Sequence, residues 1–271
     1  MIGQRLAEKL RAGERVYGTC TVTPSTRMVG AIAPAKPDFV FIDTEHNALD
    51  RTQVSWMCNT YAAKDIVPIV RITKPDAHLA ASTLDDGALG IVAPYIETMQ
   101  QVDDLRGAVK HRPLKGGRLR ERLDGQSVNG TIDTYIKERN TNNVLILNIE
   151  SQPAIDALDD LLAPPEVDAL LIGPHDLSCN LGVPEQYDAP EFLAAVQTIF
   201  DKARTAGRGA GIHFWGNLEQ QTRFLEMGAN LLIHSADVLL VKHHLAAELG
   251  AIRSAMGDAD KSGQGADDLT I

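Results

Sequence analysis

The stretches VLILNIE, at residues 144–150, and DALLIGPHD, at residues 168–176, decide the fold that this sequence predicts. Alternate residues of a strand face the same side, so Asn148 and Glu150 share one face of the first stretch. Each apolar run leads to a carboxylate, Glu150 in the first and Asp176 in the second. A carboxylate at the end of a buried strand is costly to desolvate unless a cationic group meets it. The two stretches therefore predict strands that deliver two acids to the same end of a sheet.

The two acids allow two interpretations. Carboxylates that converge beside Gly173 and Pro174 have the oxygen-rich character that Mg²⁺ and Mn²⁺ prefer. The same residues would also fit a strand-end Glu150 that pairs with Arg71, together with an Asp176 that caps a helix. Both interpretations stay open from spacing alone, because structural ion-pair networks also hold carboxylates at such positions.

Strand-length apolar runs alternate with helical patterns along the whole chain, and the near-continuous apolar character is typical of parallel strands buried on both faces. The predicted strands are 16–22, 38–43, 67–72, 89–94, 144–150, the apolar part of 168–176, 209–214 and 230–235. Eight such alternations predict one α/β domain, a (β/α)₈ TIM barrel over residues 1–256. A long helix is expected at 236–256, and the small, acidic tail 257–271 is expected to be disordered.

Composition and charge exclude several classes of protein. The chain has 271 residues, 44% hydrophobic and 23% charged, with a formal net charge of -10 that argues against nucleic acid as a main partner. Its apolar runs are shorter than the roughly 20 residues that a membrane span needs, and its N-terminus lacks the apolar core of a signal peptide. We therefore expect a cytoplasmic protein with small-molecule partners, and neither nucleic acid nor membrane.

Polar residues at the carboxyl ends of barrel strands are the candidates for chemistry. A hydrogen bond from a ring N–H of His46 to the Asp43 carboxylate would fix the tautomer of His46 and make the other ring nitrogen a better base. Arg71 presents a planar fork that suits a carboxylate, although a salt bridge to Glu45 or Glu150 is the alternative. His213 and His234 are assigned to the barrel interior or its rim rather than to catalysis.

One basic segment breaks the alternation of strands and helices. HRPLKGGRLRERLDG, at residues 111–125, holds five Lys and Arg residues against two acids in an otherwise acidic chain. It is interpreted either as a solvated surface loop or as a loop that folds back over the catalytic end, where long loops often close over substrates.

At the strand ends the chain resembles the HpcH/HpaI aldolase family, the class II pyruvate-dependent aldolases. The matching segments run in order through most of the chain, from about residue 16 to 252. They are FIDTEHN at 41–47, IVRI at 69–72, LDDGALGIVAP at 84–94, LNIE at 147–150 and LIGPHDLSCNLG at 171–182. Together they are specific, although one element such as G-P-x-D-L would not be.

The resemblance implies roles for individual residues. Glu150 and Asp176 would bind a divalent metal, Mg²⁺ or Mn²⁺ with Co²⁺ as a further option. His46 with Asp43 would form the base dyad, and Arg71 would clamp the pyruvyl group. The other implied substrate-binding residues are Asn148, Gly173, Pro174, His175, Asp176 and, near the site of a neighbouring subunit, Asp85. The resemblance also implies a homo-hexamer, a trimer of dimers whose last helix is exchanged between subunits.

The implied activity is the reversible cleavage of a 4-hydroxy-2-oxo acid to pyruvate and an aldehyde. The alternatives are a citrate-lyase-like or malyl-CoA-type lyase on the same barrel, and a catalytically idle barrel that serves as a binding module. Two departures bear on the substrate. Asn148 stands where the family usually has Gln, and residues 111–125 align poorly with the family's P-P-x-G-x-R-G segment. The sequence does not specify the aldehyde or the role of Lys115–Arg122.

Overall fold

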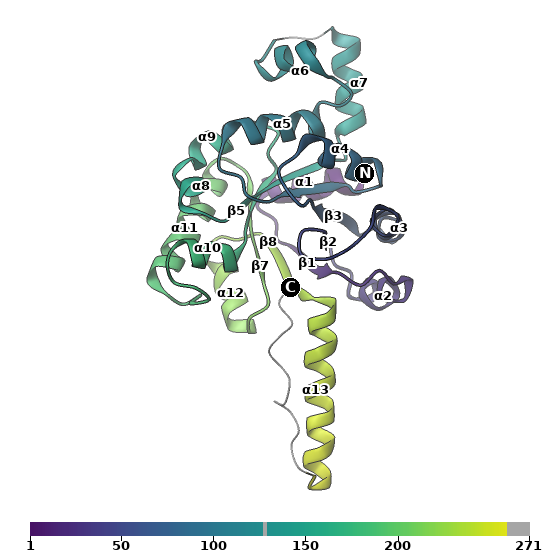
Figure 1. Ribbon diagram of the computed structural model, residues 1–271, viewed down its shortest axis with the longest axis vertical. Coiled ribbons are helices and arrows are strands. Elements are labelled where there is room, and N and C mark those ends of the chain that lie inside the picture. Colours follow the sequence, from purple (N-terminus) through teal and green to yellow (C-terminus); the bar gives the residue numbers. More distant parts are fainter. Residues whose placement is uncertain (127–128, 259–271) are drawn as a thin grey trace.

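Eight parallel strands close into a barrel in chain order, in a computed structural model that describes residues 1–126 and 129–258 (Figure 1). The strands are β1 (Val16–Thr21), β2 (Phe39–Asp43), β3 (Val67–Arg71), β4 (Gly90–Ala93), β5 (Val144–Ile149), β6 (Ala169–Ile172), β7 (Gly209–Phe214) and β8 (Leu231–Ala236). Each predicted strand is present, so the predicted (β/α)₈ barrel is confirmed. Glu150 and Asp176 lie just beyond β5 and β6, at the carboxyl end of the barrel.

Helices surround the barrel between successive strands. They are α1 (Ile2–Ala12), α2 (Thr26–Ile32), α3 (Arg51–Ala62), α4 (Ala77–Asp85), α5 (Met99–Lys110), α6 (Gly116–Leu123), α7 (Gly130–Asn140), α8 (Gln152–Asp156), α9 (Leu158–Leu162), α10 (Pro174–Asn180), α11 (Pro190–Thr205), α12 (Leu218–Glu226) and α13 (Asp237–Met256), with a short 3₁₀ turn at Ala33–Ala35. Several begin at a side-chain cap, for example Asp50, which forms a reciprocal capping box with Gln53 at the start of α3.

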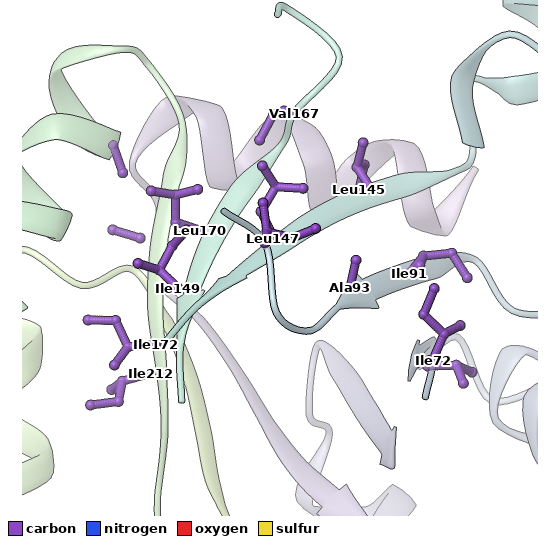
Figure 2. Close-up of a cluster of buried hydrophobic side chains, with 14 of the residues drawn as sticks. Ile72, Ile91, Ala93, Leu145, Leu147, Ile149, Val167, Leu170, Ile172 and Ile212 are labelled. Carbon is purple, nitrogen blue, oxygen red and sulfur yellow. The ribbon is translucent and has the colours of Figure 1, made fainter. Parts of the chain in front are cut away.

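Two apolar layers hold the barrel together, and strand β5 shows how one sequence supplies both. Val144 and Ile146 belong to the cluster inside the barrel, where Leu6 and Leu10 of α1 close the amino-terminal end. Leu145, Leu147 and Ile149 belong instead to the outer layer between strands and helices (Figure 2). The alternation puts Asn148 and then Glu150 on the inward face, above the apolar interior, and so brings polar groups to the carboxyl end.

Asp168 organises the opposite, amino-terminal end. Its carboxylate is almost fully buried and accepts hydrogen bonds from Arg11 Nη2 at 2.8 Å, from Lys110 Nζ at 2.5 Å and from the backbone N–H of Leu145 at 2.8 Å. A buried charge with this many donors is stabilised rather than penalised by its surroundings. Asp168 therefore ties α1 and α5 to the start of β5 and β6, far from the strand ends that carry the site.

The basic segment at residues 111–125 lies at this amino-terminal end, so the interpretation that it folds over the catalytic end is wrong. Helix α5 has already carried the chain back along the outside of the barrel before α6 begins. Figure 1 shows α6 and α7 together at the end of the molecule opposite α13. The segment is anchored there by His111, whose Nε2 lies 2.8 Å from Glu166 Oε1.

The last helix, α13, projects from the carboxyl end of the barrel (Figure 1). Asp237 anchors its first turn, because its buried carboxylate accepts from Thr21 Oγ1 at 3.0 Å and from Thr23 N at 3.1 Å. Beyond that turn its large apolar side chains are exposed: Leu240, Val241, Leu245, Leu249, Ile252 and Met256. Within residues 1–126 and 129–258 no helix is long and apolar enough to cross a membrane. The tail that the sequence predicts to be disordered lies, from residue 259 onward, outside the described residues.

Candidate active site

A cavity of about 740 Å³ opens at the carboxyl ends of the strands and contains most of the predicted site residues. Its polar lining includes His46, Arg71, Asn148, His175, Asp176, Glu185, His213, Lys242 and His243, and its apolar and aromatic lining includes Phe41, Leu171, Pro174, Tyr187, Trp215 and Leu239. A concave pocket with convergent polar groups at this end of a barrel has the geometry of an enzyme active site.

Arg71, the last residue of β3, is held by two acids. Its Nε and Nη2 donate to the two oxygens of Asp43, each at 2.8 Å, and its Nε also lies 3.1 Å from Glu45 Oε2. Burial by itself would raise the pKa of Asp43, but the hydrogen bonds and charge of Arg71 lower it below its ordinary value. Of the two salt bridges that the sequence offered as alternatives, the one from Arg71 to Glu45 is present, and Asp43 is an additional partner that was not predicted. Arg71 has five N–H donors, so donors remain for a substrate oxygen in the cavity.

The predicted hydrogen bond between Asp43 and His46 is not formed in the described part of the chain. The oxygens of Asp43 are occupied by Arg71, by the backbone N–H of Glu45 at 3.0 Å and by Asn47 Nδ2 at 3.2 Å. The nearest acid to His46 is Glu45, whose Oε2 lies 3.8 Å from Nε2. The imidazole is about half exposed and lines the cavity, so it can still meet a substrate.

Glu150 is buried beneath the cavity with its carboxylate oriented by two donors. Its Oε2 accepts from the backbone N–H of Tyr95 at 3.0 Å, and its Oε1 accepts a short hydrogen bond from Asn148 Nδ2. Burial raises the pKa of Glu150 to about 7, and the negative charges of Asp176 and Glu45 act in the same direction, against that N–H and Arg71. The carboxylate is therefore kept in place but is short of positive charge.

Gly173 allows this carboxylate to lie against the end of β6. A Cβ built on Gly173 would stand 2.5 Å from Glu150 Oε1 and 3.0 Å from its Cγ. The chain then turns into α10 with Pro174 at the first helical position, and Asp176 follows within the first turn and lines the cavity. Because Gly173 has no side chain, the Glu150 carboxylate can lie against the turn that joins β6 to α10, the helix that carries Asp176.

The donor set at Glu150 and Asp176 fits a hard divalent cation that would take most of its ligands from solvent or substrate. Among the described residues no group of three or more His, Cys, Asp or Glu side chains could by itself enclose a metal ion. Mg²⁺ is commonly held by one or two carboxylates plus water and substrate oxygens. Asn148 Oδ1 is buried without a hydrogen-bond partner in the described structure, and it adds a neutral oxygen next to Glu150.

Two further predicted residues differ in whether they line the cavity. His175 lines the cavity and is half exposed, with Nδ1 3.5 Å from Glu185 Oε1. Asp85 does not line it. That residue ends α4, where its exposed carboxylate accepts from Arg112 Nη1 at 2.8 Å. A contribution from Asp85 would therefore have to be made to another subunit.

The structure also adds residues that sequence reasoning did not assign. Tyr95, in a left-handed conformation with φ of 54°, links two acids: its N–H donates to Glu150, and its hydroxyl hydrogen bond to Glu45 raises the pKa of Tyr95 to about 12. Tyr187 and Trp215 come from loops and carried no motif that could have revealed them. Their rings pack edge to face, with centroids 6.5 Å apart.

Comparison with known proteins gives consistent matches over almost the whole chain. The sequence profile of the HpcH/HpaI aldolase/citrate lyase family matches residues 22–243. A 2-keto-3-deoxy-L-rhamnonate aldolase of Escherichia coli (strain K12) is 28% identical over 260 residues, 94% of this chain and 95% of that protein. The crystal structure of an HpcH/HpaI aldolase from Desulfitobacterium hafniense DCB-2 aligns with a TM-score of 0.79 at 26% identity, covering 92% of this chain and 96% of that one. The citrate synthase SbnG aligns with a TM-score of 0.79 at 27% identity, covering 93% and 99%.

The family match runs from the residue after β1 into α13, and the aldolase structure covers 92% of this chain. The predicted family, its lyase class and the predicted fold are thereby confirmed, whereas the roles of individual site residues stay predictions. The chain belongs to the HpcH/HpaI aldolase/citrate lyase family.

Proposed function

We propose that this chain is a divalent-metal-dependent class II aldolase that cleaves a 4-hydroxy-2-oxo acid reversibly to pyruvate and an aldehyde. The observation that carries the proposal is the arrangement of charge at one cavity, which Asp176 and the guanidinium of Arg71 line while Glu150, close enough to feel both charges, is buried beneath it. An acid-rich centre with a fixed cation next to it suits a 2-oxo acid, whose carboxylate and carbonyl oxygens need positive charge.

Glu150 and Asp176 would hold Mg²⁺ or Mn²⁺. The cation, when bound, supplies positive charge to the 2-oxo and carboxylate oxygens of the substrate. The raised pKa of Glu150 supports this assignment, since a carboxylate buried beside other acids is stabilised by a cation. Asn148 orients Glu150 through its short hydrogen bond, which gives a reason for an amide at this position.

Arg71 and His46 would act on the substrate itself. In cleavage the C3–C4 bond breaks and its electron pair passes to C3, which gives the enolate of pyruvate. The 4-hydroxyl loses its proton as C4 becomes the aldehyde carbon. Arg71, fixed by Asp43 and Glu45, would donate hydrogen bonds to the charge that develops on the enolate. His46 is the half-exposed imidazole in the cavity and would take the hydroxyl proton.

The assembly belongs to the same proposal. The exposed apolar side chains of α13, such as Leu245 and Leu249, would be covered in a homo-hexamer in which this helix packs on another subunit. The exposed carboxylate of Asp85 would then be available to a neighbouring site. The three cysteines are free thiols, which supports a reducing, cytoplasmic location.

The exchange of the methyl protons of pyruvate in deuterated water tests the site without knowledge of the aldehyde. We expect exchange that needs added Mg²⁺ or Mn²⁺, stops in chelator and is abolished in Glu150→Gln. The exposed Glu14, at the amino-terminal end, provides a matched control, and Glu14→Gln should exchange at the wild-type rate. Full exchange in chelator would refute the metal-dependent mechanism, and no exchange in the metal-loaded wild type would favour an idle barrel.

A screen of coenzyme A thioesters distinguishes the alternative, a citrate-lyase-like or malyl-CoA-type lyase, from the aldolase. Cleavage of a malyl or citryl thioester, without aldol cleavage of 4-hydroxy-2-oxo acids, would assign the barrel to the citrate-lyase-like or malyl-CoA-type reaction. We expect the opposite pattern. The same screen should include oxaloacetate as an acceptor, because the similar structure of SbnG is described as a citrate synthase.

A further inference from the structure

One wall of the cavity, at the ends of β7 and β8, is built differently from the charged side. It consists of His213 on β7, Trp215 just beyond it, and Tyr187 from the loop after α10. The rings pack together, with centroids 5.6 Å apart for His213 and Trp215. Each ring carries one or two polar atoms on an otherwise apolar body, which is the chemistry of a surface that binds carbon chains bearing neutral hydroxyl groups.

The tautomer of His213 is fixed by its neighbours. Its Nε2 lies 3.2 Å from the carbonyl oxygen of Ser235, and because a carbonyl can only accept, Nε2 must carry the proton. Burial and the nearby charge of Arg71 lower the pKa of His213 to about 4, so the ring is neutral at physiological pH. A neutral ring that donates from Nε2 has an unprotonated Nδ1, and that atom is a hydrogen-bond acceptor.

Ser235 is held in an unusual conformation while it positions this ring. Its φ of 53° lies in the left-handed region, which costs free energy for a residue other than glycine, and its side chain is buried. Such conformations are concentrated at functional sites, where the surrounding structure enforces them. The neighbouring His234 points the other way, because its Nδ1 lies 2.7 Å from Gln221 Oε1 of α12. The two histidines therefore have separate roles.

We propose that His213 is a specificity-determining residue whose Nδ1 accepts a hydrogen bond from a hydroxyl group on the aldehyde-derived half of the substrate, with Tyr187 and Trp215 as the walls of that subsite. The inference rests on the proposed aldolase function, since the charged side of the cavity would hold the pyruvyl half. An acceptor at this position favours a hydroxyl group, which can donate, over a carboxylate or a methyl group, which cannot.

Paired aldehydes that differ by one hydroxyl group test the inference in the condensation direction. Propanal and 2-hydroxypropanal would each be condensed with pyruvate in the presence of Mn²⁺. We expect the wild type to prefer 2-hydroxypropanal by about 10- to 100-fold in kcat/KM, because a site built to bond a hydroxyl rejects the analogue that lacks it. Succinic semialdehyde, which carries a carboxylate instead, should also be the poorer substrate.

Substitutions then assign the preference to one side chain. His213→Leu should lower kcat/KM for 2-hydroxypropanal by about 10-fold or more and change that for propanal by less than about 3-fold. His213→Asn can place an amide oxygen near the Nδ1 position and should retain part of the preference. The matched control is His234→Leu, on the adjacent strand but directed away from the cavity, which should keep the wild-type ratio.

Three results would overturn the inference: a wild type that does not distinguish the two aldehydes, a preference for succinic semialdehyde that His213→Leu leaves intact, or an equal loss on both aldehydes in His213→Leu. Exchange of pyruvate protons, measured on every variant, separates these results from a failure of the proposed function. Normal exchange with no aldehyde discrimination contradicts only the role of His213. Absent exchange in the metal-loaded wild type contradicts the aldolase assignment, and the role of His213 falls with it.

Discussion

The replacement Gly173→Ala tests whether the position of the Glu150 carboxylate is what the site depends on. The new Cβ would stand 2.5 Å from Glu150 Oε1, where an ordinary contact is about 3.4 Å or more. The backbone at Gly173 has φ of -86° and ψ of 96°, which alanine adopts without difficulty, so the perturbation is steric and local. Glu150 must move because the other side of the contact is the strand end itself.

The required shift is about 1 Å, and displacements of that size at a catalytic group cost about 100-fold in rate. We therefore expect kcat/KM to fall about 100-fold and the affinity for Mn²⁺ to fall about 10- to 100-fold. The free energy of unfolding should fall by only about 1–3 kcal/mol, the usual cost of overpacking one methyl group. The barrel should thus remain folded while metal binding and catalysis are both impaired.

Isothermal titration with Mn²⁺ and the exchange of pyruvate protons measure the two losses on the same preparation. Gly30→Ala is the matched control, because a Cβ at this exposed glycine of α2 would meet no atom within 4 Å. It should leave both quantities unchanged and stabilise the helix by about 0.5–1 kcal/mol. Wild-type Mn²⁺ affinity and activity in a folded Gly173→Ala variant would refute the assignment of Glu150 as a metal ligand.

Three further predictions address the rest of the molecule. Asp168→Ala should lower the free energy of unfolding by about 3–5 kcal/mol in urea titrations, because it leaves the partly buried Arg11 and Lys110 and the buried N–H of Leu145 without their acceptor; a loss below about 1 kcal/mol would contradict its role as an anchor. Although burial opposes it, the hydrogen bond from His111 and the charge of Arg106 lower the pKa of Glu166 to about 2, so this carboxylate stabilises the fold above its unfolded pKa near 4.5 and that contribution disappears as pH falls towards 2. Urea midpoints of the wild type should therefore fall more steeply between pH 5 and 2 than those of Glu166→Gln, and parallel curves would count against the ion pair. Leu245→Glu on α13 should shift the assembly to smaller species in light scattering, and an unchanged mass would show that this face is not an interface.

The barrel could be predicted because residues of each strand alternate between its two faces, and this alternation is visible in the sequence. In β5 the residues Leu145, Leu147 and Ile149 pack outward while Ile146 and Asn148 point inward, as the alternation requires. The positions of the site residues followed from the same rule, since the carboxyl ends of parallel strands meet at one end of a barrel. The fold class follows from the periodicity of apolar residues along each strand and helix, and a single sequence is enough to see that periodicity.

Pairing between the site residues could not be predicted in the same way. Asp43, Glu45 and Glu150 all lie at strand ends near Arg71. A sequence gives no distances, so it does not specify which of these acids forms the ion pair with the guanidinium. The structure gives it Asp43 and Glu45, and the expected contact between Asp43 and His46 is lost to that pairing. The basic segment at residues 111–125 was misplaced for a related reason. Its position between strands four and five was correct, but it begins only after α5 has returned the chain to the amino-terminal end.

The pairing that sequence could not supply bears on the two interpretations of Glu150 and Asp176. If Arg71 were paired to Glu150, the carboxylates at the ends of β5 and β6 would have their cation, and a structural network would suffice. Arg71 instead forms its close ion pairs with Asp43 and Glu45, and its charge only partly offsets the burial of Glu150, whose pKa remains raised to about 7. The charge of Glu150, buried beneath the cavity that Asp176 lines, is therefore only partly balanced. This imbalance supports the proposal that Glu150 and Asp176 would hold a divalent cation, which would supply positive charge to the oxygens of a 2-oxo acid.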